Sequence, residues 1–360
     1  MASIKDVAKR AGVSISTVSN VLNKSKYVSD ELKIRVNVAV QELGYQANPI
    51  AQNMKFKHTK TVGIITADLC GLFYPYVLKG MYEIFYKKGY QVIILDSDGL
   101  NDRLGSIKKL REGIHRLILN RVDGIVFAST VPESMEKGIA EDINRMASGK
   151  NKKVGLVCVE TDLSGYGIDS VFSNSVVGAE KAASHLIDMG CKRIGHITGP
   201  IFTSVAQDRL RGYKNILAKH SHPYDEATMI AEGNYTHKSG YSAMKQLLAK
   251  MPDIDGVFVA NDQMSVGALK ALCEAGKHVP QDIKLIGYDD VFIASVLEPP
   301  LSTIHIRKNY MGSKAAELLI EQIERGSETR KPAAVELESR LVVRKSTSIQ
   351  APEDWILVDW

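Results

Sequence analysis

The stretch IKDVAKRAGVSISTVSNVLN, residues 4–23, decides the fold of the N-terminal end of the chain. Ser3 precedes it as a helix N-cap candidate with Asp6 three positions on, and Gly12 is expected to end this first helix. Ser14 is placed to cap a second helix. A helix, a short Ala-Gly-Val turn and a second helix make up the helix-turn-helix layout.

The second helix has an unusual outward face, which is polar but carries no charge. Its candidate contact residues are Ile15, Ser16, Thr17, Ser19, Asn20 and Asn23. Most are mediocre helix formers, whereas a solvated helix normally carries Glu, Lys and Arg. Small hydrogen-bonding side chains suit contact with DNA base edges and phosphates. An ordinary surface face is the alternative interpretation.

Positive charge is concentrated at the same end of the chain. Residues 1–60 contain ten Lys and Arg and four Asp and Glu, which gives +6, while the other 300 residues carry 36 basic and 37 acidic side chains, which gives −1. This asymmetry favours a polyanionic partner at the N-terminal end. A solvated basic face would produce the same numbers.

Two further segments complete the N-terminal region. A third helix is predicted over residues 30–43, capped by Ser29 and ended by Gly44. Asn48 and Pro49 then suit the start of a two-turn helix. Helices below ~12–15 residues are marginal in water, so this one is expected to fold only against a partner. A plain basic linker fits residues 47–58 equally well.

From Thr61 the pattern changes to alternating strands and helices. Short apolar strands are predicted at 62–66, 92–96, 124–128 and 154–159, and a second set at 170–172, 193–198, 256–260 and 283–287, with helices between them. Two successive arrays of this kind predict an α/β body of two doubly wound parallel-sheet subdomains, which follows the all-α helix-turn-helix head.

The predicted boundaries follow from these patterns. They are a head at 1–46, a hinge helix and linker at 47–60, a body at 61–347 and a tail at 348–360. Within the body, the N-subdomain is expected at about 61–162 and 292–325, and the C-subdomain at about 163–291 and 326–347.

Polar and aromatic side chains follow the predicted strands of the body. Because ligands of open α/β sheets bind beyond the carboxyl ends of the strands, we predict one binding site made of Asp68, Phe73, Glu160, Arg209, Tyr235, Asn261 and Asp289. Carboxylates and an Arg can bind vicinal hydroxyls, and rings stack on sugar faces. For any single residue of this set, a loop cap or turn is the alternative role.

The sequence gives no support for catalysis. The nine His are scattered, and no HExxH, GxSxG, GxxxxGK[ST] or GxGxxG motif occurs. We therefore predict no enzyme activity, no catalytic residue, no cofactor and no metal site. Cys70, Cys158, Cys191 and Cys273 are isolated, which suits a reducing cytoplasm. No signal peptide or membrane span is evident, so a cytoplasmic protein without a membrane partner is expected.

Several ordered motifs strongly resemble the LacI/GalR (lactose and galactose repressor) family. In the head they are residues 4–14, 16–23, 42–45 and 48–54, and in the body 121–125, Gly199-Pro200 with Arg209 and Gly212, 260–264, 279–282, 286–290 and 300–304. The resemblance covers roughly residues 3–347. It implies a homodimer, sometimes a tetramer, that binds a near-palindromic DNA operator, and a body like a periplasmic sugar-binding protein with a small-molecule effector between its subdomains.

The resemblance also implies roles for individual residues. Ile15, Ser16 and Asn20 fall on major-groove positions, Thr17, Ser19 and Asn23 on phosphate-contacting positions, and Ala51 and Met54 on hinge positions that enter the minor groove. Arg209, Tyr235, Asn261 and Asp289 match effector-contacting positions, and Glu160 stands where Asp is usual. Asn20 stands where many members have Arg, Met54 where Leu is usual, and Ala47 where Pro is common.

A repressor of a carbohydrate-use operon, controlled allosterically by a sugar, is therefore the expected function. A purine or protein corepressor in place of the sugar stays open. So do activation at some promoters and a solute-binding module without DNA function, although such a module would need a signal peptide and no basic head.

Overall fold

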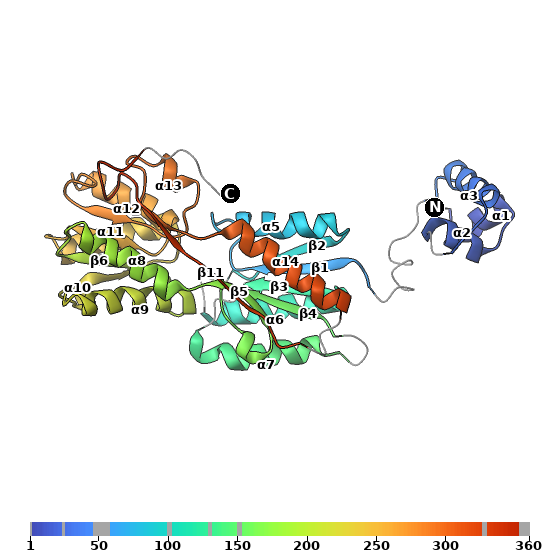
Figure 1. Cartoon of the computed structure of the whole chain (residues 1–360), viewed down its shortest axis with the longest axis horizontal. Helices are drawn as coiled ribbons and strands as arrows, with labels where there is room; N and C mark the ends of the chain where they lie inside the picture. Colours follow the sequence, from blue (N-terminus) through green and yellow to red (C-terminus); the bar gives the residue numbers. More distant parts are fainter. Residues whose placement is uncertain are drawn as a thin grey trace. The chain divides into compact units, whose positions relative to one another are not determined.

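The computed structural model describes residues 2–23, 26–45, 58–98, 103–128, 132–149, 153–325 and 330–352. These fall into two compact units, Met1–Thr59 and Lys60–Trp360. Figure 1 shows a small all-helical unit and a large unit in which helices cover parallel sheets. The hinge positions Ala47, Ala51 and Met54, and the tail beyond residue 352, lie outside the described residues.

The small unit contains the three predicted helices, α1 (Ile4–Ala11), α2 (Ile15–Asn23) and α3 (Asp30–Glu42). Val7, Val18 and Val36, one from each helix, are fully buried at its centre. Their spacing places one apolar face of each helix inward, so that the polar face of α2 is left at the surface. The predicted helix-turn-helix head is confirmed.

Local signals set the ends of these helices. Ser3 and Asp6 form a capping box, in which the Ser3 N–H donates to Asp6 Oδ2 at 2.8 Å and the Asp6 N–H donates to Ser3 Oγ at 3.4 Å. Gly12 ends α1 with a φ of 63°, a left-handed conformation that favours glycine. Ser14 Oγ accepts the Thr17 N–H at 3.1 Å and so caps α2. Ser29 makes no such side-chain bond, contrary to its predicted capping role.

The large unit is built on two main parallel sheets. One has six strands in the order β11 (Ala334–Leu337), β5 (Asp169–Ser173), β4 (Gly155–Val159), β3 (Gly124–Ala128), β1 (Thr61–Thr66) and β2 (Gln91–Asp96). The other has four, in the order β7 (Ile230–Glu232), β6 (Ile194–Thr198), β8 (Gly256–Val259) and β9 (Lys284–Ile286). We call the parts around them the N-subdomain and the C-subdomain. A short antiparallel pair, β10 (Thr303–His305) and β12 (Arg340–Val342), completes the strands.

Helices cover both faces of each main sheet, as expected of doubly wound folds. In the N-subdomain they are α5 (Tyr74–Lys87), α6 (Arg103–Leu119), α7 (Glu133–Ala147) and α14 (Lys308–Arg325), and in the C-subdomain α8 (Ser175–Asp188), α9 (Ser204–Lys219), α11 (His237–Lys250) and α12 (Asp262–Glu274). The short α10 (Glu226–Met229), α13 (Ile293–Val296) and the 3-10 turn η1 (Ser164–Tyr166) lie in connections. Gly80 and Gly312 let α5 and α14 pack closely, since a Cβ on Gly80 would lie 2.0 Å from the Asn309 carbonyl oxygen.

The sheet topology corrects the predicted subdomain boundaries. Residues 163–173 and 326–337 were expected in the C-subdomain, but β5 pairs with β4, and β11 pairs with β5, in the sheet of the N-subdomain. Asp169 holds this edge, because its carboxylate accepts hydrogen bonds from Arg330 and from the Ala333 N–H. Residues 292–307, expected in the N-subdomain, instead lie along the C-subdomain, where Ser302 and His305 bridge to Ile286 and Asp289. The chain therefore crosses between the subdomains near residues 174, 307 and 338.

Candidate functional site

One pocket between the subdomains, here called the main pocket, is lined by all of the predicted binding residues. Its walls contain Asp68, Phe73, Glu160, Arg209, Tyr235, Asn261 and Asp289, together with Gly71, Leu72, Tyr74, Thr203, Val205, Gln263 and Val291. They lie on loops and helix starts that follow β1, β4, β6, β7, β8 and β9. The carboxyl ends of parallel strands thus bring together residues that are more than 200 positions apart in the sequence.

The N-subdomain wall is the loop between β1 and α5. Asp68 Oδ1 accepts the Cys70 N–H at 2.8 Å, which folds this loop back on itself. The Leu72 N–H reaches across the pocket to Gln263 Oε1, 3.3 Å away at the start of α12 in the C-subdomain. Through this hydrogen bond the loop of the N-subdomain is attached to the C-subdomain beside the main pocket.

Arg209 is the central cation of the C-subdomain wall. It is 6% exposed, and its guanidinium carbon lies 3.8 Å from the centre of the Tyr288 ring. Its Nη1 donates to the Ala260 carbonyl oxygen, and its Nη2 donates to Asp289 Oδ1 at 3.3 Å. Stacking on a ring and pairing with a carboxylate are the interactions that suit a planar guanidinium. They fix Arg209 at the pocket before any ligand is present.

Two acidic groups of the pocket have raised pKa values. Burial raises the pKa of Glu160 to about 7, against opposing contributions from the Tyr74 hydroxyl, which donates a hydrogen bond to Glu160, and from Arg209. Burial likewise raises the pKa of Asp289 to about 6, with Arg209 and Lys308 opposing it. Loss of water destabilises the charged form of a carboxyl group. These carboxyls are therefore ready to accept or donate hydrogen bonds near neutral pH.

Asn261 has a structural role as well as a place in the lining. Its Oδ1 accepts the Met264 N–H at 2.8 Å, which caps α12, and its Nδ2 donates to the Tyr235 carbonyl oxygen at 3.2 Å. Asn261 therefore has the capping role that was the alternative for each single candidate. Tyr235 has a φ of 65° and is kept beside the pocket by this bond.

Other acids that follow the strands do not line the main pocket. Asp96 Oδ2 accepts the Leu69 N–H at 3.1 Å, and Asp98 pairs with Lys109. Asp262 is buried, and it accepts the Val291 N–H at 2.9 Å and the Thr303 hydroxyl at 2.6 Å. Asp290 pairs with His305 and Arg344. These carboxylates stabilise loops.

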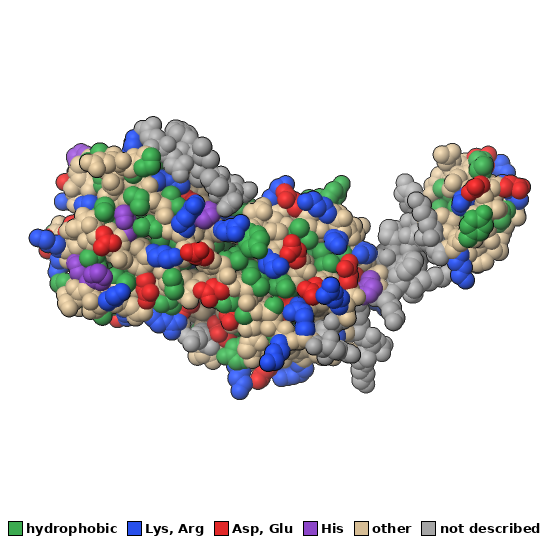
Figure 2. Space-filling model, viewed as in Figure 1, with side chains coloured by type: hydrophobic (Ala, Val, Ile, Leu, Met, Phe, Trp, Pro, Cys, Tyr) green, Lys and Arg blue, Asp and Glu red, His purple; other side chains and the backbone are tan. Residues whose placement is uncertain are grey.

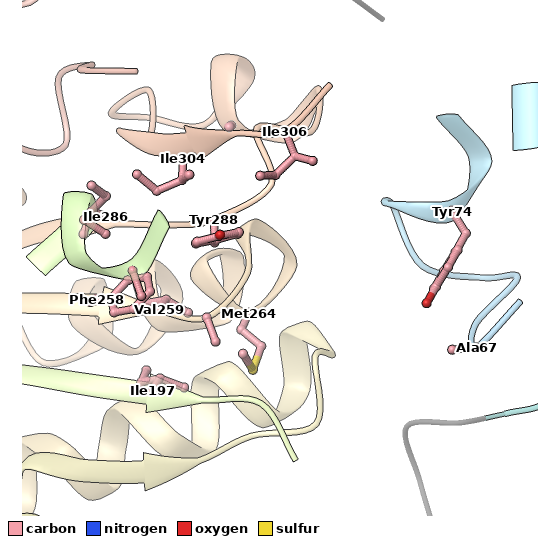
Figure 3. Close-up of a cluster of buried hydrophobic side chains, with 14 of the residues drawn as sticks. Ala67, Tyr74, Ile197, Phe258, Val259, Met264, Ile286, Tyr288, Ile304 and Ile306 are labelled. Carbon is pink, nitrogen blue, oxygen red and sulfur yellow. The ribbon is translucent and has the colours of Figure 1, made fainter. Parts of the chain in front are cut away.

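Tyr74, Thr203 and Gln263 line the main pocket but were not predicted as individual site residues. Tyr74 begins α5, and its apolar neighbours made it indistinguishable from the core face of that helix. Figure 3 shows Tyr74 on the N-subdomain side and Tyr288 and Met264 on the C-subdomain side. Gln263 belongs to a motif that was noted, but only the fold shows that it faces the loop after β1.

The chemistry of the main pocket favours a neutral ligand with many hydroxyl groups. It offers three carboxyl groups as acceptors, and its one Arg is already paired with Asp289. The rings of Phe73, Tyr74 and Tyr235 provide flat apolar surfaces beside them. An anionic ligand would meet carboxylates without an uncommitted cation, which costs free energy in a desolvated site. Among the described residues there is no group of three or more His, Cys, Asp or Glu arranged to hold a metal ion.

The predicted DNA-contacting face of α2 lies at the surface of the head. Ile15 is 42% exposed, Ser16 is also exposed, and Thr17, Ser19 and Asn20 are partly exposed, while Val18 between them is buried. The Ser14 hydroxyl lies 2.7 Å from that of Ser16 and 2.9 Å from that of Thr17, which orders the start of this face. The side chain of Asn23, and the hinge residues Ala51 and Met54, lie outside the described residues.

The surface of the body differs from the basic head. On the face drawn in Figure 2, Lys and Arg side chains are interspersed with Asp and Glu over the large unit. This agrees with the nearly balanced charge of residues 61–360. None of the described helices has the length and apolar composition that would let it cross a lipid bilayer.

The chain is similar to known proteins over nearly its whole length. Residues 3–48 match the family described as bacterial regulatory proteins, lacI family, and residues 183–347 match the periplasmic binding protein-like domain. The HTH-type transcriptional repressor PurR of Edwardsiella ictaluri is 34% identical, over 97% of this chain and 97% of its own length. The ribose operon repressor of Escherichia coli K12 is 33% identical, over 90% and 93%.

The chain is also similar to solved structures of transcriptional regulators. The lac repressor dimer bound to operator and the anti-inducer ONPF has a TM-score of 0.83 and 25% identity, and the match covers 96% of this chain and 99% of that one. A complex of the transcriptional regulator CelR with cellobiose has a TM-score of 0.67 and 29% identity, with 96% and 100% covered.

Proposed function

Because this chain belongs to the lacI family of bacterial regulatory proteins, we propose that it is a sequence-specific transcriptional repressor whose DNA affinity is set by a sugar bound in the main pocket. The observation that carries this proposal is the main pocket itself. It joins carboxyl groups, a paired Arg, an amide and aromatic rings of both subdomains in a chain that begins with a basic helix-turn-helix head. A solute-binding module without DNA function does not account for that head.

The head supplies the contacts with DNA. Ile15, Ser16 and Asn20 contact base edges in the major groove, and Thr17, Ser19 and Asn23 contact phosphates. Ala51 and Met54 enter the minor groove, where an apolar side chain can wedge between base steps and kink the duplex. The excess of basic residues in the first 60 positions makes the affinity dependent on salt.

The effector belongs to the main pocket. Arg209, Glu160 and Asp289 bind hydroxyl groups, Asn261 adds an amide, and Phe73 and Tyr235 pack against the apolar face of a sugar ring. Asp68 completes the wall on the N-subdomain side. Two of the names fit a sugar, since one relative is a ribose operon repressor and a structural neighbour holds cellobiose, whereas the name PurR does not indicate a sugar. They describe repressors rather than enzymes, in agreement with a chain that binds this ligand without converting it.

A homodimer provides the two heads that a near-palindromic operator requires. A surface suited to the contact between copies lies on α5 and the edge strand β2. There Tyr82, Tyr86 and Ile94 are 52%, 70% and 44% exposed, and the two Tyr rings stack at 5.8 Å. An exposed apolar patch at a sheet edge favours pairing with another copy of the chain. Because the proposed partner is DNA, the proposed location of the protein is the cytoplasm.

Sugar binding controls DNA affinity through the relation between the subdomains. The main pocket contacts both, and the chain crosses between them three times near residues 174, 307 and 338. A sugar that binds more tightly to one relative orientation of the subdomains stabilises that orientation. This changes the spacing of the two heads in the dimer. A coupling of about 1–3 kcal/mol changes the operator affinity about 5–150-fold.

The experiment is selection of duplexes from a random pool with the purified full-length chain, followed by fluorescence anisotropy with and without neutral sugars. We expect one enriched near-palindromic site whose affinity changes at least fivefold with a sugar. Ser16→Glu, which adds a negative charge on the outer face of α2, should abolish specific binding. Gln41→Glu, which adds the same charge on exposed α3, should have a small effect. Absence of any preferred duplex at moderate salt would overturn the proposal.

A further inference from the structure

Two further spaces adjoin the main pocket at Glu160 and Val205. A small inner space beside it shares Phe73, Glu160, Val205 and Arg209 with the main pocket. A larger space, here called the side chamber, then shares Glu160 and Val205 with both. The side chains of Glu160 and Val205 therefore stand between two neighbouring spaces. The atom-free space is about 630 Å³ in the main pocket and about 760 Å³ in the side chamber, open parts included.

The side chamber is a polar space bounded by both subdomains. Besides Glu160 and Val205, its walls include Glu136, Thr161, Asp162, Ser173, Ser204 and Asp208. Thr161 follows β4 of the N-subdomain and Ser204 begins α9 of the C-subdomain, and their hydroxyls lie 3.4 Å apart. A ligand group in this chamber would touch both halves of the body, as a ligand in the main pocket does.

Two buried polar atoms at the passage between the spaces lack hydrogen-bond partners among the residues that the structure describes. Ser173 is 8% exposed and Arg209 is 6% exposed, and among the described residues no hydrogen-bond partner is found for Ser173 Oγ or Arg209 Nε. Ser173 lines the inner space and the side chamber, while Arg209 lines the inner space and the main pocket. Buried polar atoms are rarely left without partners in folded proteins. Hydroxyl groups of a ligand that passes between the spaces would satisfy both.

We propose that the effector is a disaccharide, with one sugar ring in the main pocket and the second in the side chamber. This inference rests on the proposed function and narrows it to a substrate class. The walls of both spaces are rich in groups that accept hydrogen bonds from hydroxyls or donate hydrogen bonds to them. The side chamber has four acids, Glu136, Glu160, Asp162 and Asp208, against one Arg, Arg211, which is paired with Asp208; this charge balance disfavours a phosphate at this end of the ligand.

The test is isothermal titration calorimetry of the full-length protein with matched sugars. The probes are glucose with cellobiose and maltose, galactose with lactose, fructose with sucrose, and xylose with xylobiose. We expect at least one disaccharide to bind ten or more times tighter than either of its component monosaccharides. If every disaccharide binds no tighter than its components, or no sugar of the panel binds, the inference is overturned.

A pair of variants locates the second ring. Asp208→Phe fills the side chamber from the partly exposed face of α9 and should lower the affinity for the binding disaccharide at least tenfold, with the affinity for its monosaccharide unchanged. Gln207→Phe is the matched control, because Gln207 is the neighbouring residue on α9 and does not line the chamber. Equal losses in the two variants, or none in either, would place the second ring elsewhere and overturn the assignment.

Failure of this inference can be distinguished from failure of the proposed function. If the protein selects a specific duplex but responds only to monosaccharides, the proposed function stands and the second subsite is refuted. A chain that selects no duplex loses the proposed function, whatever sugar it binds.

Discussion

The Lys308 ammonium group donates a hydrogen bond of 2.6 Å to the carbonyl oxygen of Asp289. It also donates to the carbonyl oxygens of Asp290 and Ile306, at 2.9 Å and 3.2 Å, and only 2% of Lys308 is exposed. Asp289 and Asp290 have φ values of 101° and 54°, a left-handed conformation that needs support from its surroundings. Because Lys308 begins α14, this contact links the Arg209 partner in the main pocket to a helix of the N-subdomain.

Lys308→Met should therefore weaken the link between ligand and DNA. The variant leaves buried carbonyl groups without a donor, and an unsatisfied buried group costs about 1–3 kcal/mol. We expect a free energy of unfolding lower by at least that amount in urea titrations, and a smaller change of operator affinity on sugar addition. Lys314→Met, on the same helix but partly exposed and paired with Glu317, is the control. A Lys308→Met protein with a full sugar response would show that the contact is only structural.

Arg209→Ala should abolish the sugar response and leave specific DNA binding intact. The guanidinium stacks on Tyr288 and pairs with Asp289, so its loss removes both a ligand donor and the partner that keeps Asp289 in place. Sugar binding is measured by calorimetry and operator binding by anisotropy. Lys214→Ala on the exposed side of the same helix, where Lys214 pairs with Glu226, should change neither. A normal response in the Arg209 variant would remove this residue from the site.

Asn20→Arg should change the preferred operator at one symmetric base pair. Asn forms paired hydrogen bonds with adenine and Arg with guanine, and each good pair contributes about 1–3 kcal/mol of discrimination. Asn20 lies on the partly exposed face of α2, so the longer side chain can be accommodated without a change in the core of the head. Duplex selection with the variant should favour G·C at that position. The same selected site for both proteins would contradict the assignment of Asn20 to a base edge.

Glu160→Gln should change how stability depends on pH. The pKa of Glu160 is raised to about 7 by burial, above the ordinary value of 4.5, so the folded protein binds more protons than the unfolded chain between these pH values. The stabilisation from the protonated carboxyl is present below about pH 4.5 and is lost as the pH rises through about 7. We expect the free energy of unfolding to fall over this window by about 1–3 kcal/mol, and the fall to be smaller in Glu160→Gln.

The control for this experiment is Glu226→Gln, since Glu226 is an exposed carboxylate on the C-subdomain. Its removal should leave the fall in stability between pH 4.5 and 7 in place. Asp289, whose pKa is raised to about 6 by burial, keeps part of the fall in both variants. Identical pH profiles for the wild-type protein and Glu160→Gln would contradict the raised pKa.

Prediction from the sequence succeeded where a rule connects local pattern with place in the fold. The candidates Asp68 and Asn261 were chosen because they follow predicted strands, and both line the main pocket. Asp96 and Asp262 also stand at or just after the ends of strands, but they stabilise loops instead. A carboxylate after a strand can bind a ligand or a neighbouring N–H, and the sequence does not distinguish the two. That choice depends on which backbone groups the packed loops leave unpaired.

Local sequence patterns were enough to predict the helix-turn-helix head, the alternation of strands and helices, and the residues that meet at the main pocket. These depend on periodicity, capping residues and the shared direction of parallel strands, which are local properties. Three features became visible only in the folded chain: β5 and β11 join the sheet of the N-subdomain, Lys308 supports Asp289, and a side chamber adjoins the main pocket. Each of these is a contact between distant segments, and short apolar strands carry no local signal for the partner with which they pair.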